Sequence, residues 1–355
     1  MQWARWIVVM SLAIALGCAS SHTKKPTDKE LATKRWSGAR AAVLGQLARE
    51  QYESGNFDKS RLTLNEALRL NPDSGPLHLL SAKLAIEQGQ LELADKELAA
   101  ARRADPKNPE VEYFSGVVYQ RWQQPERALE FYQFACEKAP TELAYLMAQA
   151  ETLVSMDRAD EALELLKQKV TYFEHSAVIR DAAGQLLARQ QKWPEAVDML
   201  RQATVLAEDD VTVREHYAMA LYFNKQYRES SDVLARLVSN DKCSNRGDLF
   251  LALGECQLQL NQPRQAWTSI EKATQLSPNS SEAWVSLAKA SLKLGDMRRA
   301  ELSAHRAISI EAGCGEAHLM LGYVQLREDH LADALASFRK ACALDAKDTV
   351  GLCMT

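Results

Sequence analysis

The chain has 355 residues, of which 46% are hydrophobic and 25% are charged, and its formal net charge is −4. These are ordinary values for a globular protein, so they exclude collagen, a disordered chain and a coiled-coil rod. The 43 basic and 47 acidic residues nearly balance, which gives the chain no overall attraction for nucleic acid, and we expect no nucleic-acid partner.

Residues 1–17 are predicted to be a signal peptide. Arg5 is the only charged residue among them, and an apolar run follows from Trp6 to Leu16. That run is about eleven residues long, roughly half of what a membrane-spanning helix needs, and it has the length of a signal-peptide core. It ends in Ala15-Leu16-Gly17-Cys18, which resembles the lipobox of bacterial lipoproteins.

The lipobox resemblance implies that the chain is cut before Cys18 and that the thiol of Cys18 carries a diacylglycerol. In this family a residue other than Asp after the cysteine implies transport to the outer membrane, and Ala19 stands there. We therefore expect a protein of the cell envelope that is lipid-anchored at the periplasmic face of the outer membrane. The alternative is an ordinary secretory signal that is cut near Ala19-Ser20.

Residues 18–40 are predicted to be the lipidated cysteine and a polar tether. Between residues 19 and 34 the only large apolar residue is Leu31, and such a composition is typical of a flexible spacer.

From residue 41 onward small residues recur with a period of 34, except for one step of 36 within the polar segment 238–248. The two extra residues predict a longer loop there, which either changes the curvature of the superhelix or is a tolerated insertion at the surface. The first series is Ala48, Ala82, Gly116, Ala150, Gly184, Ala218, Gly254, Ala288 and Gly322. The second is Ser60, Ala94, Ala128, Ala162, Ala196, Ser230, Ala266, Ala300 and Ala334. Together they predict nine repeats, 41–74, 75–108, 109–142, 143–176, 177–210, 211–244, 247–280, 281–314 and 315–348.

Each repeat has the pattern of two helices joined by a turn. In repeat 75–108 one apolar stripe with helical spacing precedes Gly89, and a second follows it and ends before Pro106. Gly89 is expected to end the first helix and turn the chain. The small residues at positions 8 and 20 of the repeat would face each other and let the two helices pack closely.

This pattern resembles the tetratricopeptide repeat. The family has small residues at positions 8, 20 and 27 and proline at position 32, where this chain has Pro72, Pro106, Pro140 and Pro278. The resemblance implies an all-α fold, an α-solenoid of about nine 34-residue helix–turn–helix repeats that forms a right-handed superhelix. Repeats 1–6 would occupy residues 41–244 and repeats 7–9 residues 245–348, followed by a tail at 349–355.

In this family the first helix of each pair lines a concave groove through its positions 2, 5, 9, 12 and 13. On this sequence the resemblance places there Arg49, Tyr52, Lys83, Tyr113, Val117, Arg121, Met147, Glu151, Asp181, Glu215, Met219, Tyr222, Glu255, Lys289, Lys293, Tyr323 and Arg327. Basic residues prevail in the outer repeats and acidic residues in repeats 4–7. This mixture suits a partner peptide or helix with apolar anchors and charged flanks. The alternative is that several of the Tyr and Met side chains pack between repeats.

The sequence has no motif of a catalytic, metal or cofactor site. HExxH, CxxC and GxSxG motifs and a Gly-Lys phosphate loop are all missing, and no two histidines stand four residues apart. We therefore expect no catalytic residue, no metal and no cofactor. An oxidising compartment would permit disulfides, and Cys314–Cys342 and Cys342–Cys353 are the pairs that sequence distance allows.

The sequence thus predicts a non-catalytic envelope lipoprotein that binds a protein partner in its groove. One specific alternative is an assembly factor of type IV pili or secretion systems that is similar to pilotins. Another is an adaptor in polysaccharide export or peptidoglycan biogenesis. An enzyme is disfavoured, because no stretch outside the repeats is long enough for a catalytic domain. Repeat arrays normally need a polar cap at the end, so the last repeat could be covered by self-association, by a partner or by the tail.

Overall fold

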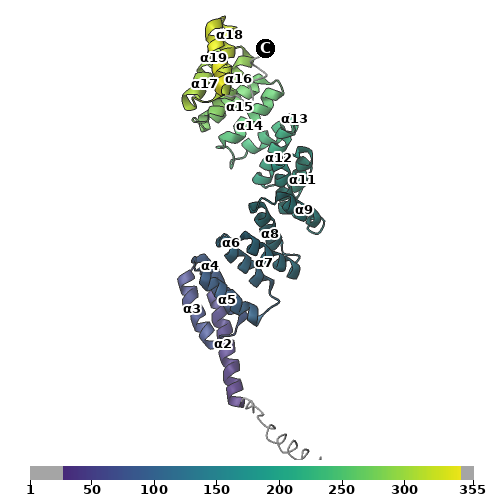
Figure 1. Cartoon of the computed structure of the whole chain (residues 1–355), viewed down its shortest axis with the longest axis vertical. Coiled ribbons are helices and arrows are strands. Elements are labelled where there is room, and N and C mark those ends of the chain that lie inside the picture. Colours follow the sequence, from purple (N-terminus) through teal and green to yellow (C-terminus); the bar gives the residue numbers. More distant parts are fainter. Residues whose placement is uncertain (1–26, 345–355) are drawn as a thin grey trace, which may run out of the picture. The chain divides into compact units, whose positions relative to one another are not determined.

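The computed structural model describes residues 27–344, and these residues form helices and no strand (Figure 1). The helices are α2 (Asp28–Glu53), α3 (Phe57–Leu70), α4 (Gly75–Glu87), α5 (Leu91–Ala104), α6 (Pro109–Arg121), α7 (Pro125–Lys138), α8 (Leu143–Ser155), α9 (Ala159–Val170), α10 (Ala177–Arg189), α11 (Trp193–Leu206), α12 (Val211–Phe223), α13 (Tyr227–Val238), α14 (Gly247–Gln259), α15 (Pro263–Leu276), α16 (Ser281–Leu294), α17 (Met297–Ile310), α18 (Gly315–Arg327) and α19 (Leu331–Leu344). The expected all-α class is confirmed for this range. The predictions for the signal peptide, for Cys18 and for the tail lie outside the described residues.

The helices follow one another as helix–turn–helix pairs in which the even-numbered helix comes first. Each first helix from α4 to α18 begins at the first residue of a predicted repeat, from Gly75 to Gly315. Within each part the two helices of a pair pack together, as α4 does with α5 and α14 with α15, and α15 packs in turn on α16. The expected helix-pair repeats are therefore confirmed.

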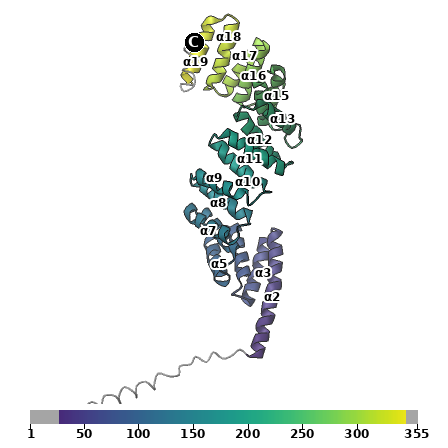
Figure 2. The same ribbon diagram turned by 90° about the vertical axis from the view of Figure 1, so that its right-hand side faces the viewer.

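The chain divides into two compact parts, Met1–Thr152 and Leu153–Thr355. The division falls inside α8, and Figure 2 labels most of the helices of each part. The long connection between α13 and α14 lies within the C-terminal part.

Small residues close each helix pair, as the sequence predicts. Ala48 and Ser60, at positions 8 and 20 of the first repeat, are fully buried. The Ser60 hydroxyl donates a hydrogen bond to the Ala48 carbonyl at 2.7 Å, and in the sixth repeat the Ser230 hydroxyl donates to the Ala218 carbonyl at 2.8 Å. Because these side chains are small, the two helices approach closely and the serines also satisfy their own hydroxyls.

The chain turns between the paired helices through a residue with positive φ at position 15 of the repeat. These residues are Gly55, Gly89, Gln123, Asp157, Gln191, Lys225, Asn261, Gly295 and Asp329. Glycine adopts this left-handed conformation without strain, whereas other residues do so at a cost. The predicted turn at Gly89 is confirmed, and the same turn forms in six repeats that have no glycine there.

The structure corrects three sequence-based expectations. The flexible tether is wrong from Asp28 onward, because α2 begins at that residue. The connection at 239–246 is indeed longer than its counterparts, but it is more than a surface insertion: its Cys243 is buried in the cluster that holds Leu237 and Leu249. The Cys314–Cys342 pairing is wrong, because Cys314 has a free thiol. The other suggested pair involves Cys353, which lies outside the described residues.

Candidate functional site

In the N-terminal part, two basic side chains expected in the groove are bound by the neighbouring repeat. Lys83 on α4 forms an ion pair with Glu110 on α6, and its ammonium lies 4.8 Å from the ring centre of Phe114. Arg121, near the end of α6, donates a hydrogen bond to the carbonyl of Ile86 on α4. Both side chains therefore tie first helices of successive repeats together.

The aromatic residues of this part lie in the packing between repeats. Tyr113 on α6 stacks on Tyr145 of α8 with ring centres 4.9 Å apart, and it also lies 5.7 Å from the ring of Tyr132. Burial raises the pKa of Tyr145 to about 12. Tyr52 is half-buried, and burial together with the nearby Glu87 raises its pKa. Tyr113, Tyr132 and Tyr145 thus form one aromatic cluster, whereas Tyr52 packs separately against Phe57.

The remaining expected residues of the N-terminal part are more accessible. Met147 on α8 is half-buried, Val117 on α6 is half-buried, and Glu151 is exposed on α8. Val117 packs against the neighbouring hydrophobic clusters, and Glu151 forms no ion pair within the described residues.

In the C-terminal part the same kind of lateral pairing recurs. His216 on α12 forms a hydrogen bond with Asp181 on α10 at 2.8 Å, which raises the pKa of His216. Glu255 on α14 accepts hydrogen bonds from the Tyr222 hydroxyl at 3.1 Å and from the Ser286 hydroxyl at 3.0 Å. These bonds link the first helices of four successive repeats.

Basic residues complete these links. Lys289 on α16 pairs with Glu316 on α18, and Lys293 donates to the Leu258 carbonyl at 3.0 Å. The Arg246 guanidinium lies 2.8 Å from a carboxylate oxygen of Glu215.

Three other residues of the C-terminal part were expected in the groove. Met219 is half-buried and packs against a hydrophobic cluster, and the Tyr323 ring packs edge-on against Phe338 with ring centres 5.4 Å apart. Arg327 is exposed at the end of α18.

Two rules describe the pairing in both parts. A lysine at position 9 pairs with a glutamate at position 2 of the next repeat, as Lys83 does with Glu110 and Lys289 with Glu316. A basic residue at position 13 donates to the carbonyl at position 12 of the preceding repeat, which also accepts from the backbone N–H at position 15 of its own repeat. Most of the charged residues expected to meet a partner are thus engaged by groups of the protein itself, either in ion pairs or in hydrogen bonds with neutral groups.

Arg49 departs from this pattern. It stands at position 9 of the first repeat, but position 2 of the next repeat is Pro76 instead of a glutamate. Within residues 27–344 no ion pair or hydrogen bond engages its guanidinium. Arg49 is therefore a basic group of the first-helix face that is open to an external anion.

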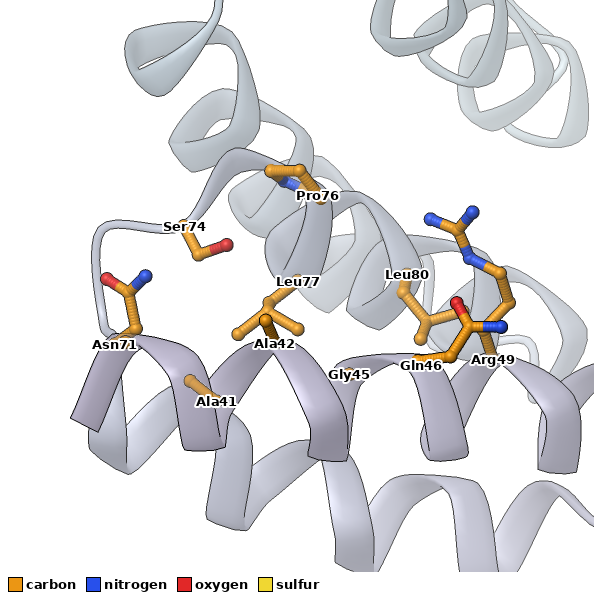
Figure 3. Close-up of a pocket in the computed structure, with 11 residues that line it drawn as sticks. Ala41, Ala42, Gly45, Gln46, Arg49, Asn71, Ser74, Pro76, Leu77 and Leu80 are labelled. Carbon is orange, nitrogen blue, oxygen red and sulfur yellow. The ribbon is translucent and has the colours of Figure 1, made fainter. Parts of the chain in front are cut away.

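A hollow of about 240 Å³ lies beside Arg49, between α2 and α4. It is lined by Gly38, Ala41, Ala42, Gly45, Gln46, Arg49, Asn71, Ser74, Pro76, Leu77 and Leu80. Figure 3 shows its polar ends, with Arg49 and Gln46 on one side and Asn71 and Ser74 on the other, and the small side chain of Ala42 between them. A cavity of ~150 Å³ is enough to hold benzene, so the hollow has room for one large apolar side chain.

Small residues on α2 open this hollow. A Cβ atom at Gly45 would lie 2.6 Å from a methyl carbon of Leu77, so glycine is what allows α4 to lie so close at that point. One turn earlier on α2, Ala41 and Ala42 leave space that a larger side chain would fill. Arg49 was predicted from the sequence, whereas the other lining residues were missed. The signal that could have found them is Pro76 at position 2, where the third, seventh, eighth and ninth repeats carry an acid.

The arrangement favours recognition over chemistry. A guanidinium binds carboxylates through two parallel hydrogen bonds, and amide and hydroxyl groups bind peptide backbone. Within residues 27–344, no three His, Cys, Asp or Glu side chains gather where they could hold a metal ion. In the same range no helix combines the length and the apolar character that crossing a bilayer requires.

Comparison with protein families identifies the repeats. Family models of the tetratricopeptide repeat match residues 51–114 and residues 285–349. Helix pairs with the same period and the same small residues lie between these segments. The chain therefore contains tetratricopeptide repeats, and such repeats serve as protein-interaction scaffolds. No curated protein matches the sequence.

Several solved structures resemble parts of the fold. YrrB, a tetratricopeptide repeat protein with an unusual peptide-binding site, is 18% identical and covers 53% of this chain and 96% of its own, with a TM-score of 0.43. MamA from Desulfovibrio magneticus RS-1 is 18% identical and covers 48% and 97%, with a TM-score of 0.45. A tetratricopeptide repeat protein from Parabacteroides merdae ATCC 43184 is 18% identical and covers 71% and 98%, with a TM-score of 0.47.

Proposed function

We propose that this protein is a non-catalytic scaffold that binds an extended segment of a partner protein at the hollow between α2 and α4. The observation that carries the proposal is the unpaired guanidinium of Arg49 beside an apolar recess with polar ends. A large apolar side chain of the partner would enter the recess, and a nearby carboxylate would bind Arg49. Gln46 and Asn71 would hydrogen-bond the backbone of the bound segment.

Peptide binding to the purified chain tests this proposal. From an array of random synthetic peptides with free carboxyl termini, we expect the bound sequences to share a large apolar residue close to a carboxylate. Arg49→Glu should weaken the best peptide at least about tenfold in fluorescence anisotropy, because a charge-assisted hydrogen bond contributes about 1.5–3 kcal/mol. Ala42→Tyr should weaken it as well, by filling the recess from an exposed position.

A matched control separates the site from general charge effects. Arg69→Glu makes the same change of charge on α3 of the same repeat, at an exposed residue outside the hollow. It should leave peptide affinity unchanged. Equal loss in Arg49→Glu and Arg69→Glu would contradict the proposed site.

We also propose that the scaffold works in the cell envelope, held by a lipid on Cys18 at the periplasmic face of the outer membrane. The lipobox-like sequence Ala15-Leu16-Gly17-Cys18 supports this location. In cells fed radiolabelled palmitate, the wild-type chain should carry label and sediment with membranes. Cys18→Ser should lose both properties, and its retention in the membrane fraction would count against the anchor.

The envelope process is open to a direct genetic comparison. A pilotin-like role in type IV pilus or secretion-system assembly predicts loss of surface pili when the gene is deleted. An adaptor role in polysaccharide export or peptidoglycan biogenesis predicts altered capsule, biofilm or cell wall while pili remain. Within the described residues, Arg49 and its hollow are compatible with either partner.

A second candidate interaction is self-association through α18 and α19. Leu331 is 60% exposed and Leu335 is 51% exposed on α19, whereas Val197 of the fifth repeat, at the same position as Leu335, is buried. We propose that a second copy covers this face. Light scattering at micromolar concentration should give a dimer mass that falls to the monomer mass in Leu331→Ser/Leu335→Ser. A wild-type monomer mass would refute self-association.

A further inference from the structure

The first repeat has an exposed apolar stripe on α2. Val43 is 70% exposed and Trp36 63% exposed, and Leu47 is also exposed. They follow one another at spacings of seven and four residues, which places them on one face of the helix. Such a contiguous stripe on an otherwise polar helix indicates a surface that something covers.

The register of the repeats explains why this stripe is open. Val43 stands at position 3, and the residues at this position in the next two repeats, Leu77 and Val111, are buried. Those residues pack against the preceding repeat. In front of α2 the described residues contain no preceding helix pair, so position 3 of the first repeat has no such partner.

The N-terminal half of α2 is also basic. Residues 27–40 contain four basic and two acidic residues, and Lys29 and Arg40 lie on the same helix face as Trp36 by their spacing. The Arg40 guanidinium lies 5.7 Å from the centre of the Trp36 ring and also pairs with Glu66 at 2.7 Å. Tryptophan with adjacent cations is typical of segments that lie in the headgroup region of a bilayer.

We infer that the stripe formed by Trp36, Val43 and Leu47 docks on an anionic phospholipid surface. The inference rests on the proposed anchor in one respect, the distance to the membrane. Nine residues lie between Cys18 and Asp28, and the ten steps along the chain from one to the other reach at most about 36 Å. A lipid on Cys18 would therefore hold α2 within reach of the bilayer, where the basic residues meet acidic headgroups and the apolar side chains enter the interface.

This contact would orient the scaffold. An anchor at Cys18 alone would not fix the orientation of the first repeat, whereas docking of α2 would fix the direction in which this repeat presents its surface. The hollow beside Arg49 opens on α2 as well, but its residues, including Ala42 and Gly45, lie on a different face from the stripe. Lipid binding and peptide binding can thus occur together in the first repeat.

Sedimentation with phospholipid vesicles tests the inference without any anchor. The processed chain is prepared from residue 18 with Cys18→Ser, so that the result is independent of lipidation. It should sediment with vesicles that contain phosphatidylglycerol and phosphatidylethanolamine, bind far less to phosphatidylcholine vesicles, and be released as salt rises. Failure of this chain to bind would overturn the inference and leave the anchor and the peptide site untouched.

Two pairs of variants define the surface. Val43→Ser/Leu47→Ser should lower the vesicle partition coefficient at least about fivefold, while Leu302→Ser, at a leucine that is 61% exposed on α17, should not change it. Lys29→Glu should lower it about fivefold, and Lys34→Glu, on the opposite side of α2, much less.

Equal effects within either pair would overturn the docking surface. The inference would also be overturned if the wild type were a dimer in light scattering without vesicles and Val43→Ser/Leu47→Ser were a monomer. A second copy of the chain would then cover the stripe.

Discussion

Replacement of Gly116 by alanine should destabilise the third helix pair, although alanine is the better helix former. A Cβ atom at this position would lie 2.5 Å from Cε1 and 2.7 Å from Cδ1 of Tyr132. The Tyr132 ring is 1% exposed, and its hydroxyl donates a hydrogen bond to the Gln120 side chain at 2.7 Å. The ring also contacts Tyr113, so it has little room to move away.

The opposing contributions can be weighed. Alanine gains about 1 kcal/mol over glycine in a helix. Overpacking of a buried site costs about 1–3 kcal/mol. If the Tyr132 ring is displaced, its hydrogen bond to Gln120, which contributes about 1 kcal/mol, is weakened as well. We therefore expect Gly116→Ala to lower the free energy of unfolding by about 1–2 kcal/mol.

Urea unfolding followed by circular dichroism measures this change. Gly38→Ala is the matched control, because no atom lies within 4 Å of a Cβ at that helical position, and it should stabilise by about 0.5–1 kcal/mol. The double variant Gly116→Ala/Tyr132→Leu recreates the pairing of Ala82 with Leu98 in the second repeat and should recover part of the loss. Equal stability of Gly116→Ala and the wild type, with no coupling in the double variant, would refute this packing explanation.

Three further predictions concern the turns and the buried charges. In urea unfolding, Gly89→Ala should destabilise and Gln191→Gly should stabilise, each by roughly 1 kcal/mol, because both residues have positive φ; opposite signs would contradict the turn geometry. The hydrogen bond to Asp181 raises the pKa of His216 above 6.5, so its stabilising contribution is present below pH 6.5 and is lost as pH rises through the raised value. In His216→Gln, the free energy of unfolding measured between pH 6 and 9 should no longer contain this pH-dependent contribution. Burial alone would raise the pKa of Glu112, but hydrogen bonds from the flanking Arg102 and a lysine outweigh it and lower the pKa below 4.5. The contribution of ionised Glu112 to folding stability is present above pH 4.5 and is lost as pH falls through the lowered pKa. Glu112→Gln should lower the free energy of unfolding at neutral pH by about 1–3 kcal/mol. On acidification, this variant should lose less of its remaining stability than the wild type does.

The repeat boundaries could be predicted because packing places the same demand on every pair. Only small side chains fit at positions such as Ala82 and Ala94, so they recur in register whatever the surrounding sequence. The turns between the paired helices were harder to predict from the sequence. Gly89 signals its turn, whereas Gln191 is held at positive φ by the helices on either side and gives no local signal.

The start of α2 was missed for a different reason. Residues 28–35 are polar, which is typical of a tether, but they include Glu, Leu, Ala, Lys and Arg, which are good helix formers. Continuity with the helix of the first repeat lets this polar segment extend it, because propagation of an existing helix needs no new nucleus.

The site was predictable only in outline. The resemblance placed Arg49 and Lys83 on one face, but whether each charge is free depends on the residue at position 2 of the following repeat. Glu110 neutralises Lys83, and Pro76 leaves Arg49 unpaired. The recess beside Arg49 depends on side-chain volumes of two helices at once, which no single segment of sequence specifies.

Site-specific photo-crosslinking in cells tests the central claim most directly. A photoreactive amino acid at Gln46 lies in the hollow, and the same group at Leu62 lies on the exposed surface of α3 outside it. The scaffold account predicts one dominant envelope protein captured from position 46, absent from position 62, and lost when Arg49→Glu is added. Capture of the same proteins from both positions, or capture from position 46 that Arg49→Glu leaves unchanged, would contradict it.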